Sequence, residues 1–548
     1  MEYGREKKRS LYAVAEDYFT YLGTHLPQQC ASDEFYFLPR SEAAILHLNR
    51  LDDLSPDKIR DHIQYVRNLL GEIPPHMEKD MAGEIDGHLL RQSMESFIRE
   101  FEGAAVWRRD PTLYVKIPLF AMDQAMSQED KTLDQAREDL AQLLGQIPPF
   151  LSLGAKNLGS VSDISRQVGL DMTRDAVHFH LQDVRPFIEG RMGEDKGLFG
   201  KNQAAVDAWE TYKRDLMNVP RRESFAVGAE GLEEMLGVNL DYSRPLHEIL
   251  EIAQSTYRET REKLEVLAKS IDSSKVWSRI LYETLPSVPS GHVFMELYQG
   301  EVQNLRRFFI NQDILTIPSG EEVRVLQTPH YLRSLRATAS YRSPLTGNTK
   351  GKGVFFLTPG EEDLGLIAAH APYLCAHETY PGHHILDHYR IRHSNPIRRQ
   401  IESPLFYEGW ACYGEQLLDE AGYVPDPRRQ LIGLKRRLWR SLRAILDVQL
   451  QTGGLTLAQA AKKIQDIGYS PPRARRQARR FALTPGYQLC YAMGIYEIIR
   501  LREQFSSRMG LKRFHDMLIQ GGEMPFHLVE KRLEAKKHSS PLPLGRIQ

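Results

Sequence analysis

The chain has 548 residues, of which 41% are apolar and 26% are charged, and its formal net charge is −1. These proportions are ordinary for a soluble globular protein, and the near-neutral charge excludes a general electrostatic attraction to nucleic acid or anionic membranes. No stretch approaches 18 uninterrupted apolar residues, and Met1 to Arg9 lacks the apolar run of a signal peptide. We therefore expect a cytoplasmic protein that binds neither nucleic acid nor membrane.

Helical signals dominate the first half of the chain. Ser55-Pro56-Asp57 opens a segment with apolar residues at helical spacing, and the segment closes before Pro74-Pro75. The sequence around that ending, 69–75, recurs at 143–149. A duplicated helical hairpin and a shared way of stopping a helix both explain the recurrence, and we favour the second. We predict a loop at 193–203 and longer helices near 246–271, 430–450 and 488–506.

The region just before residue 358 has β character. Segments 323–326, 337–341 and 353–357 are separated by turn residues, so we predict three short strands. Thr358-Pro359-Gly360-Glu361 then supplies a helix N-cap, a proline in the first turn and a capping-box acid. A helix is expected to follow, and Pro372 either kinks it or begins a new segment.

The chemically richest stretch runs from His377 to His384 and reads His-Glu-Thr-Tyr-Pro-Gly-His-His. Tyr407-Glu408-Gly409-Trp410 then supplies a second carboxylate. Catalytic zinc sites take three protein ligands, often from His and Glu, and a nearby carboxylate accepts the proton of the metal-bound water. We therefore predict a Zn2+ site with Glu378 as general base and three ligands: His377, Glu408, and either His383 or His384.

The spacing differs from that of the common zinc helix, His-Glu-x-x-His, in which the two histidines lie one turn apart. Pro381 takes the place of the second histidine. On an unbroken helix the first and last histidines of the stretch would lie roughly 10.5 Å apart along the axis, too far for one zinc ion with bonds of about 2.0–2.1 Å. The helix must therefore be interrupted between Tyr380 and His383. Pro381-Gly382 suits this, because proline breaks the hydrogen-bond ladder and glycine can take a positive φ.

These motifs resemble the DUF885 family, a group placed among zincin-like metallopeptidases. The resemblance implies a mostly helical fold, a zinc-activated water and peptide-bond hydrolysis, with the segment around Glu408 as the third-ligand helix of a gluzincin. Treating Pro381-Gly382 as a two-residue insertion in the family's zinc helix favours His383 over His384. The resemblance covers most of the C-terminal half and rests on four stretches: His377-Glu-x-x-Pro-Gly-His-His, Glu408-Gly-Trp-Ala, Arg440-x-x-Arg443-x-x-x-Asp447, and Pro485-Gly486 with Tyr491-x-x-Gly494.

The resemblance also implies that Tyr491 is catalytic, since zinc peptidases use a phenol or an imidazole to stabilise the tetrahedral oxyanion. Family members usually read Asp-Thr-Gly-x-His after the aspartate at 447, whereas this chain carries Gln451 in place of the histidine. Glutamine can donate a hydrogen bond to an oxyanion but cannot carry a positive charge or shuttle a proton. The departure implies an activity that is altered, slow or specialised.

Several residues near these motifs have two interpretations each. Glu415 lies seven residues after Glu408, on the same helical face, and either supports the site or forms a surface salt bridge. Five arginines within 473–480 either recognise a carboxylate of a substrate or partner, or form a solvated face, which is the commoner role of such a run. The strand 353–357 is either an edge to which an extended substrate adds or part of a structural sheet. Three cysteines near the motifs are interpreted as small buried residues: Cys375, Cys412 and Cys490.

We therefore predict a mainly α fold, a large helical zincin-like metallopeptidase with a small β-sheet beside the metal helix. Residues 1–300 are expected to form one wall of the cleft, and residues 301–548 the zinc-binding catalytic region. The predicted function is zinc-dependent hydrolysis of peptides, with Glu378 and Tyr491 as catalytic residues. The alternative is a catalytically weak zinc-containing protein that binds a peptide. The base at Glu378 favours the enzyme.

Overall fold

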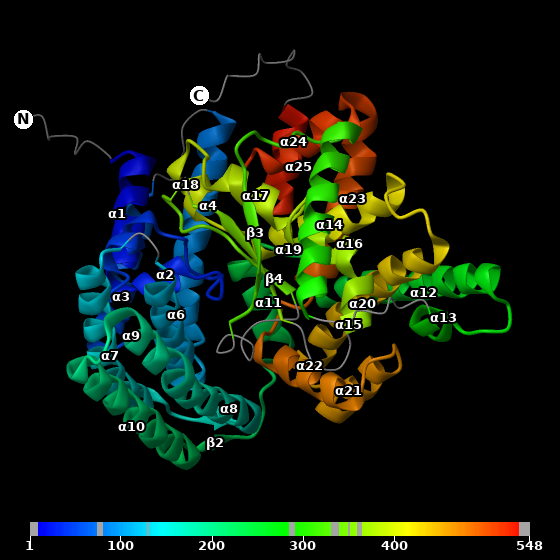
Figure 1. Cartoon of the computed structure of the whole chain (residues 1–548). Coiled ribbons are helices and arrows are strands. Elements are labelled where there is room, and N and C mark those ends of the chain that lie inside the picture. Colours follow the sequence, from blue (N-terminus) through cyan, green and yellow to red (C-terminus); the bar gives the residue numbers. More distant parts are fainter. Residues whose placement is uncertain are drawn as a thin grey trace, which may run out of the picture.

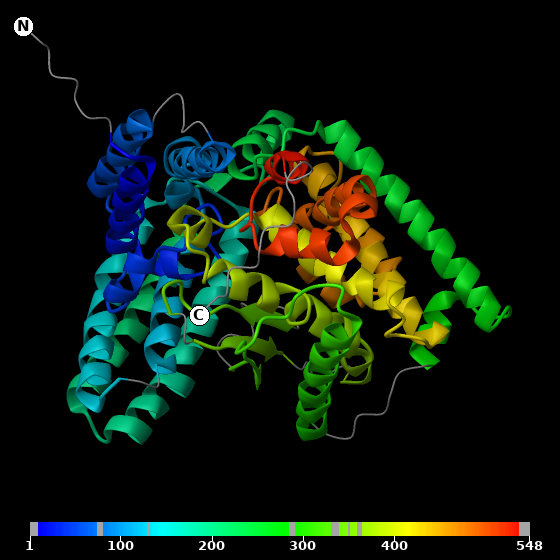
Figure 2. The same cartoon turned by 90° about the horizontal axis from the view of Figure 1, so that it is seen from above.

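The computed structural model describes residues 9–73, 80–128, 131–283, 291–329, 339–348, 351–358 and 364–535. Helices predominate in this part of the chain, so the expected mainly α class is confirmed. The early helices lie on one side of the molecule, most of the later ones lie on the other, and a small sheet lies between them (Figure 1). The same division is visible from above (Figure 2).

The N-terminal side is a layered group of helices. The helices of this group are α1 (Leu11–His25), α2 (Pro27–Ala31), η1 (Glu42–His47), α3 (Pro56–Glu72), α4 (Met81–Ile98), η2 (Arg99–Gly103), α5 (Val106–Arg109), α6 (Leu113–Ser127), α7 (Leu133–Asn157), α8 (Asp163–Phe179), η3 (His180–Val184), α9 (Arg185–Met192) and α10 (Lys196–Asn218). Helix α10 packs against both α7 and α8. A short parallel pair, β1 (Val161–Ser162) with β2 (Arg221–Arg222), joins the ends of this layer.

The second group of helices surrounds the predicted metal motif. It consists of α11 (Gly228–Asn239), α12 (Leu246–Ile271), α13 (Trp277–Glu283), α14 (Gly291–Gln312), α15 (Leu364–Ala369), α16 (Ala371–Glu378), α17 (His383–Arg390), α18 (Pro396–Gln400), α19 (Pro404–Glu420), α20 (Pro427–Gln451), α21 (Leu457–Gln465), α22 (Pro471–Leu483), α23 (Cys490–Met509), α24 (Leu511–Ile519) and α25 (Phe526–Ala535). Helix α12 packs along α20, and α19 packs along α23. The boundary expected at residue 300 stays a prediction.

The predicted strands are confirmed as one three-stranded sheet. Its strands are β3 (Val323–Gln327), β4 (Ala339–Arg342) and β5 (Gly353–Leu357), in the order β3-β5-β4. Strand β5 is parallel to β3 and antiparallel to β4. Because β5 is paired on both sides, its backbone has no free edge, and the interpretation of 353–357 as a substrate edge is wrong. The helix-start signal at 359–361 lies outside the described residues.

The longer predicted helices correspond to α12, α20 and α23 within a few residues at each end, and Pro372 begins a new helix, α16. The loop predicted at 193–203 is wrong, because the Asp195 side chain accepts a hydrogen bond from the Leu198 amide and caps α10. The helix end predicted at 143–149 is also wrong, since α7 continues through two prolines to Asn157. Its buried apolar face compensates for the lost backbone bonds. The related Pro74-Pro75 lies outside the described residues.

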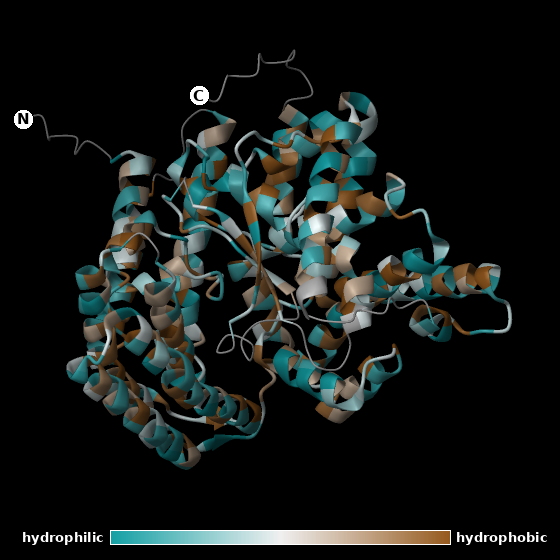
Figure 3. Cartoon of the chain, viewed as in Figure 1, coloured by the Kyte–Doolittle hydropathy of each residue, from teal (hydrophilic) through white to brown (hydrophobic). Residues whose placement is uncertain are grey.

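Apolar segments face the inside of both helix groups, and the hydrophilic faces point outward (Figure 3). Among the fully buried side chains of the described residues are Trp209 in the N-terminal group and Trp410 beside the metal motif. None of the described helices has the length and apolar character needed to cross a membrane.

Candidate metal centre

The motif from His377 to His384 is divided between two helices. Helix α16 ends at Glu378 and α17 begins at His383, so the predicted interruption is confirmed. Between them the Trp410 indole N–H donates a hydrogen bond to the carbonyl of Pro381 at 2.8 Å. This contact ties the turn to α19, the helix that carries Glu408.

Gly382 is needed in the turn for a reason other than the predicted positive φ. Its φ is −71°, so the residue does not adopt the predicted positive φ. A Cβ at this position would instead collide with the backbone carbonyl oxygens of Ala376 and His377. Glycine is required because the chain folds back closely on the end of α16.

His377, His383 and Glu408 meet in the interior of the protein. The Nε2 atoms of His377 and His383 lie 3.4 and 3.7 Å from Oε2 of Glu408. The three candidate ligand atoms all lie within 4.8 Å of one another. Ligand atoms on one tetrahedral zinc ion, with bonds of about 2.0–2.1 Å, lie roughly 3.3 Å apart. The observed spacing therefore fits a single ion with small adjustments.

The carboxylate of Glu408 has one satisfied and one unsatisfied oxygen. Its Oε1 accepts a hydrogen bond from the Tyr487 hydroxyl at 2.8 Å. Its Oε2 is buried and has no hydrogen-bond partner within the described ranges. Buried polar atoms are almost always hydrogen-bonded or bound to an ion. An orphaned carboxylate oxygen that faces two imidazole nitrogens fits the donor set of a zinc site.

His384 points away from this cluster. Its Nε2 lies 3.0 Å from Oε2 of Glu321, and its Nδ1 lies 3.3 Å from the Tyr341 hydroxyl. Tyr380 and Arg306 also donate hydrogen bonds to Glu321. The structure thus brings His383 to the candidate site and engages His384 in a separate buried network.

Glu415 supports the first histidine. Its Oε1 lies 3.0 Å from Nδ1 of His377, and the carboxylate also pairs with Arg436 and Arg440. The side chain is buried, so the surface salt-bridge interpretation is wrong. A carboxylate on the far nitrogen fixes the orientation of a ligand imidazole and increases its basicity.

The three side chains of the cluster differ in their protonation. Burial opposes ionisation of Glu408, but the neighbouring imidazoles of His377 and His383 lower its pKa to about 2. Burial and repulsion from His377 lower the pKa of His383 to about 3. Burial also disfavours protonated His377, yet its contacts with Cys412, Glu408 and Glu415 raise its pKa well above the ordinary value. The cluster therefore holds an ionised carboxylate, a neutral imidazole and a protonated imidazole, and His377 must release its proton to bind a metal.

Glu378 lies beside the cluster as the last residue of α16 and is buried. Of the residues that the structure describes, none hydrogen-bonds or pairs with its carboxylate. Burial raises the pKa of Glu378 to about 7, with the charge of Glu408 adding to the rise and that of His377 opposing it. An unengaged carboxylate with a pKa near 7 suits a general base.

Close contact between α19 and α23 brings Tyr491 to the site. A Cβ on Gly409 would lie 2.5 Å from the Cα of Gly494, so the two helices approach to backbone contact. The Tyr491 ring lies parallel to the His377 ring at 6.4 Å, and its hydroxyl interacts with Glu408. Burial and the charge of Glu408 raise the pKa of Tyr491, so the phenol stays protonated and can donate.

The turn before α23 is held by Asp447. Its carboxylate accepts hydrogen bonds from the backbone amides of Gly486 and Gln488 at 3.0 and 2.8 Å. This anchor positions Tyr487, a site residue that the sequence reasoning missed. Tyr487 lies in the turn before α23 and not on the helix that carries Tyr491, so helical spacing could not have indicated it.

The side-chain amide of Gln451 is not free to donate a hydrogen bond to an oxyanion. Its side-chain amide donates to the backbone carbonyls of Phe481 and Ala482, both at 3.3 Å. A donor used to brace the end of α22 is not available to an oxyanion, and the effect of Gln451 on activity stays a prediction. The cysteines are buried, as predicted: Cys375, Cys412 and Cys490.

Two cavities adjoin the cluster. One has a volume of about 220 Å³ and is lined mainly by α20 and α22. The other, of about 210 Å³, extends past His383 and Glu408 toward α6 and β4. Both cavities contact His377, Glu378 and Tyr491. A reactant bound at the cluster can therefore extend in two directions.

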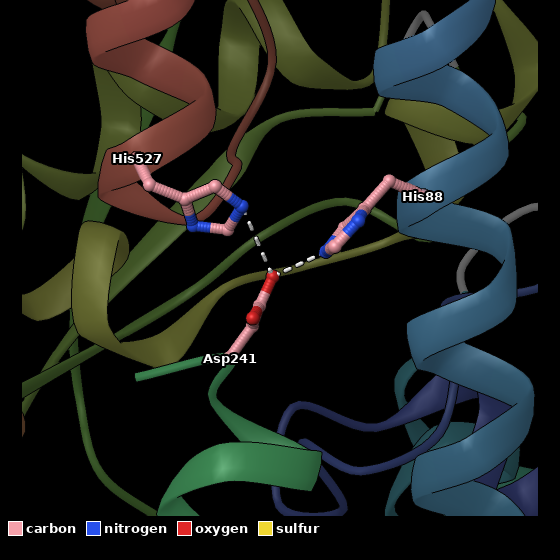
Figure 4. Close-up of side chains that lie close together, drawn as sticks. All are labelled: His88, Asp241 and His527. Atoms are coloured by element: carbon pink, nitrogen blue, oxygen red, sulfur yellow. Dashed lines mark hydrogen bonds and ion pairs between the residues drawn. The ribbon is translucent and has the colours of Figure 1, made fainter. Parts of the chain in front are cut away.

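A second cluster with the same donor types lies elsewhere in the described part of the chain. His88 of α4, Asp241 of the segment after α11 and His527 of α25 point toward one another (Figure 4). Asp241 Oδ2 is hydrogen-bonded to Nε2 of His88 and lies 3.7 Å from Nε2 of His527. No sequence pattern predicted this cluster, because its members are more than 150 positions apart.

Comparisons with known proteins identify the fold but no activity. A family model described as "Bacterial protein of unknown function (DUF885)" matches residues 41–533. A crystal structure described as a "putative lipoprotein" from Colwellia psychrerythraea has a TM-score of 0.81 at 17% identity, and the match covers 97% of this chain and 99% of that one. A "putative lipoprotein of unknown function" from Shewanella oneidensis has a TM-score of 0.75 at 17% identity, covering 96% and 100%. No curated protein matches the chain.

Proposed function

The chain belongs to the DUF885 family of bacterial proteins of unknown function, and we propose that it is a zinc-dependent peptidase that hydrolyses peptide bonds with a metal-activated water. The observation that carries the proposal is the buried, orphaned Oε2 of Glu408, which faces Nε2 of both His377 and His383. Structural zinc sites use four protein ligands, whereas three protein ligands beside an unengaged carboxylate are typical of catalytic sites. Glu378 supplies that carboxylate.

Each side chain has a role that follows from its position. His377, His383 and Glu408 would hold the ion, which when bound lowers the pKa of a water to about 7 and polarises the scissile carbonyl. Glu378 accepts the proton of the attacking water and transfers it to the leaving nitrogen. Tyr491, which stays protonated, donates a hydrogen bond to the oxyanion as the tetrahedral intermediate forms.

The proposal includes a gluzincin-like arrangement of ligands. The first histidine and the base end α16, the second histidine begins α17 after the interruption, and the third ligand lies on α19. We infer a peptide substrate, because two cavities that meet at the cluster leave room for a chain beside the reacting bond. The cytoplasmic location and the absence of nucleic-acid and membrane partners stay predictions.

The proposal is tested by metal analysis and a peptide-library digest of the purified wild-type chain and of Glu378→Gln. We expect about one zinc per chain in both proteins. Hydrolysis should fall by about 10²-fold or more in the variant, because glutamine keeps the shape of the side chain and removes its basicity. Glu262→Gln, an exposed substitution of the same kind on α12, is the matched control and should not alter either measurement.

The outcomes separate the enzyme from the alternative. Wild-type protein without stoichiometric metal, in preparations never exposed to chelator, overturns the zinc site. Wild-type protein that carries zinc and binds library peptides as tightly as Glu378→Gln, yet cleaves none of them, replaces the enzyme by a zinc-containing peptide-binding protein.

A further inference from the structure

The cavity between α20 and α22 is strongly basic. Of the described residues that line it, Glu378 is the only carboxylate. His370 and several aromatic side chains complete the wall. The basic residues number six: Lys435, Arg436, Arg440, Arg443, Arg473 and Arg480.

Part of this positive charge is not compensated by the protein. Arg436 and Arg440 share the single carboxylate of Glu415. Arg443 donates to the side-chain oxygen of Gln488 at 3.0 and 2.7 Å, and its guanidinium lies 3.5 Å from the centre of the Tyr491 ring. The Gln488 amide and the Tyr491 ring orient this guanidinium but do not neutralise its charge. Arg443 therefore presents a fixed positive charge beside the candidate oxyanion donor.

Helix α22 adds two further cations to the same wall. Arg473 lies 5.1 Å above the Tyr469 ring, and Arg480 lines both cavities. Neither side chain has a carboxylate within ion-pair distance in the described part of the chain. Arg480 is exposed along part of its side chain, whereas Arg473 is half-buried. The remaining arginines of the run are exposed and do not line the cavity: Arg475, Arg476 and Arg479. The run thus contains three arginines that face solvent alone and two that also line the cavity.

The second cavity has a different charge. Its lining includes acidic side chains from several elements, and some of them already pair with basic neighbours, as Glu34 does with Lys116. The acidic residues of that lining are Asp33, Glu34, Glu378, Asp387, Glu402 and Glu408. The two cavities that meet at Glu378 therefore differ in charge: the first is strongly basic, whereas the acidic lining of the second is interspersed with Arg40, Lys116 and Arg480. A substrate that carries negative charge at one end and not at the other would enter in one orientation.

We propose that the basic cavity binds a carboxylate of the substrate, with Arg443, Arg473 and Arg480 as the recognising side chains. The inference rests on the proposed peptidase function and adds its specificity. Guanidinium groups suit this task because their planar donors match the two oxygens of a carboxylate and keep their charge at every physiological pH. The carboxylate comes either from the free C-terminus of the peptide or from an acidic side chain, and the test distinguishes these sources.

The test compares the wild-type chain with Arg473→Gln/Arg480→Gln. The control is Arg475→Gln/Arg479→Gln, which removes the same two charges from the same helix on its exposed face. Three versions of one cleavable peptide are used: a free C-terminal acid, its C-terminal amide, and the amide with a Gln→Glu change next to the cleaved bond. The readout is kcat/KM for each peptide, with zinc content as a check on folding.

We expect the wild-type chain and the control to prefer one carboxylate-bearing peptide over the neutral amide by about tenfold or more. In Arg473→Gln/Arg480→Gln the ratio of kcat/KM values for the carboxylate-bearing peptide and the neutral amide should fall toward one, whereas Arg475→Gln/Arg479→Gln should keep the wild-type ratio. A preference for the free acid identifies the C-terminus as the source, and a preference for the Glu peptide identifies a side chain. Equal rates on all three peptides in the wild-type chain overturn the inference but leave the peptidase in place.

A binding arm keeps the inference testable if no peptide is cleaved. Affinities of the same three peptides are measured in the Glu378→Gln background, with and without the two arginine substitutions. Carboxylate-dependent binding that is lost with Arg473 and Arg480 supports the basic cavity even where hydrolysis fails. Equal affinities for the peptides with and without the carboxylate overturn the inference.

Discussion

Two clusters in this protein contain two histidines and one acidic residue, and they differ in the burial and in the hydrogen bonding of those residues. In the inner cluster the side chains of His377, His383 and Glu408 are 6–7% exposed. In the outer cluster those of His88, Asp241 and His527 are 38, 22 and 52% exposed. Water can therefore compete for the outer cluster far more easily than for the inner one.

The clusters also differ in what their ligand atoms already do. Asp241 Oδ2 is hydrogen-bonded to His88 Nε2 (Figure 4), so two of the three donors satisfy each other. In the inner cluster Oε2 of Glu408 has no hydrogen bond within the described residues, and the far nitrogen of His377 is held by Glu415. Two histidines and one acidic residue that lie close together are therefore not enough to define a metal site. Burial, supporting hydrogen bonds and an unsatisfied ligand atom distinguish the inner cluster.

The largest predicted effect is the loss of zinc from the inner cluster. His383→Ala should remove stoichiometric zinc from the purified chain, because it deletes one of three ligands. His384→Ala should keep the metal, since that side chain engages Glu321 and Tyr341 instead. His527→Ala is the matched control in the outer cluster and should also keep it. Elemental analysis after dialysis measures all three. Zinc that is lost in His527→Ala and retained in His383→Ala would reverse the assignment of the two clusters.

The sequence predicted the chemistry of the inner cluster better than its geometry. The spacing of His377 and Glu378, with Pro381-Gly382 after them, required an interrupted helix, and the structure has one. The choice between His383 and His384 could not be made from the residues alone. It depends on Glu321, a buried carboxylate that comes from a segment about 60 positions earlier and engages His384.

Other failures have the same origin in long-range packing. The central position of β5 depends on two strand pairings that local propensity does not reveal. The prolines inside α7 are tolerated because the helix is packed on both sides of them, whereas a local rule ends the helix there. Gln451 is used by the backbone of a neighbouring helix. The outer cluster has no sequence signature at all, because three separate segments contribute to it: α4, the segment after α11, and α25.

A smaller effect is predicted for Glu415, which contacts a ligand histidine but does not itself bind the metal. Glu415→Gln should weaken zinc affinity by about 10–100-fold, the usual cost of losing a carboxylate that orients a ligand histidine. Competition with a chromogenic chelator measures the affinity. Glu420→Gln, on the same helix but paired with Arg502 at the surface, is the matched control and should bind zinc as the wild-type chain does. Equal affinities in the two variants would show that Glu415 stabilises Arg436 and Arg440 rather than the metal site.

The smallest predicted effect concerns protonation of the outer cluster in protein freed of metal. The hydrogen bond that His88 donates to Asp241 raises the pKa of His88 above its ordinary 6.5, against the effect of burial, with Glu95 adding to the rise and Arg91 opposing it. A raised pKa in the folded state stabilises the protein below pH 6.5, and the gain is lost as pH rises through the raised value. Wild type should therefore exceed His88→Gln in stability by about 0.5 kcal/mol at pH 5.5, as for other exposed pairs, and by less at pH 9.

His527 should show the opposite dependence on pH, which makes the pair of variants a strict test of the outer cluster. Burial lowers its pKa in the folded state, and the charges of His88 and Lys531 add to this against the attraction of Asp241. Protonation then favours the unfolded chain, so wild type loses stability relative to His527→Gln as pH falls below 6.5. Thermal denaturation at pH 5.5 and 9, with chelator present, measures both slopes. If instead added zinc raises the melting temperature of wild type at pH 9 and of neither His88→Gln nor His527→Gln, the outer cluster is itself a metal site. The contrast between the two clusters then becomes one of affinity rather than of function.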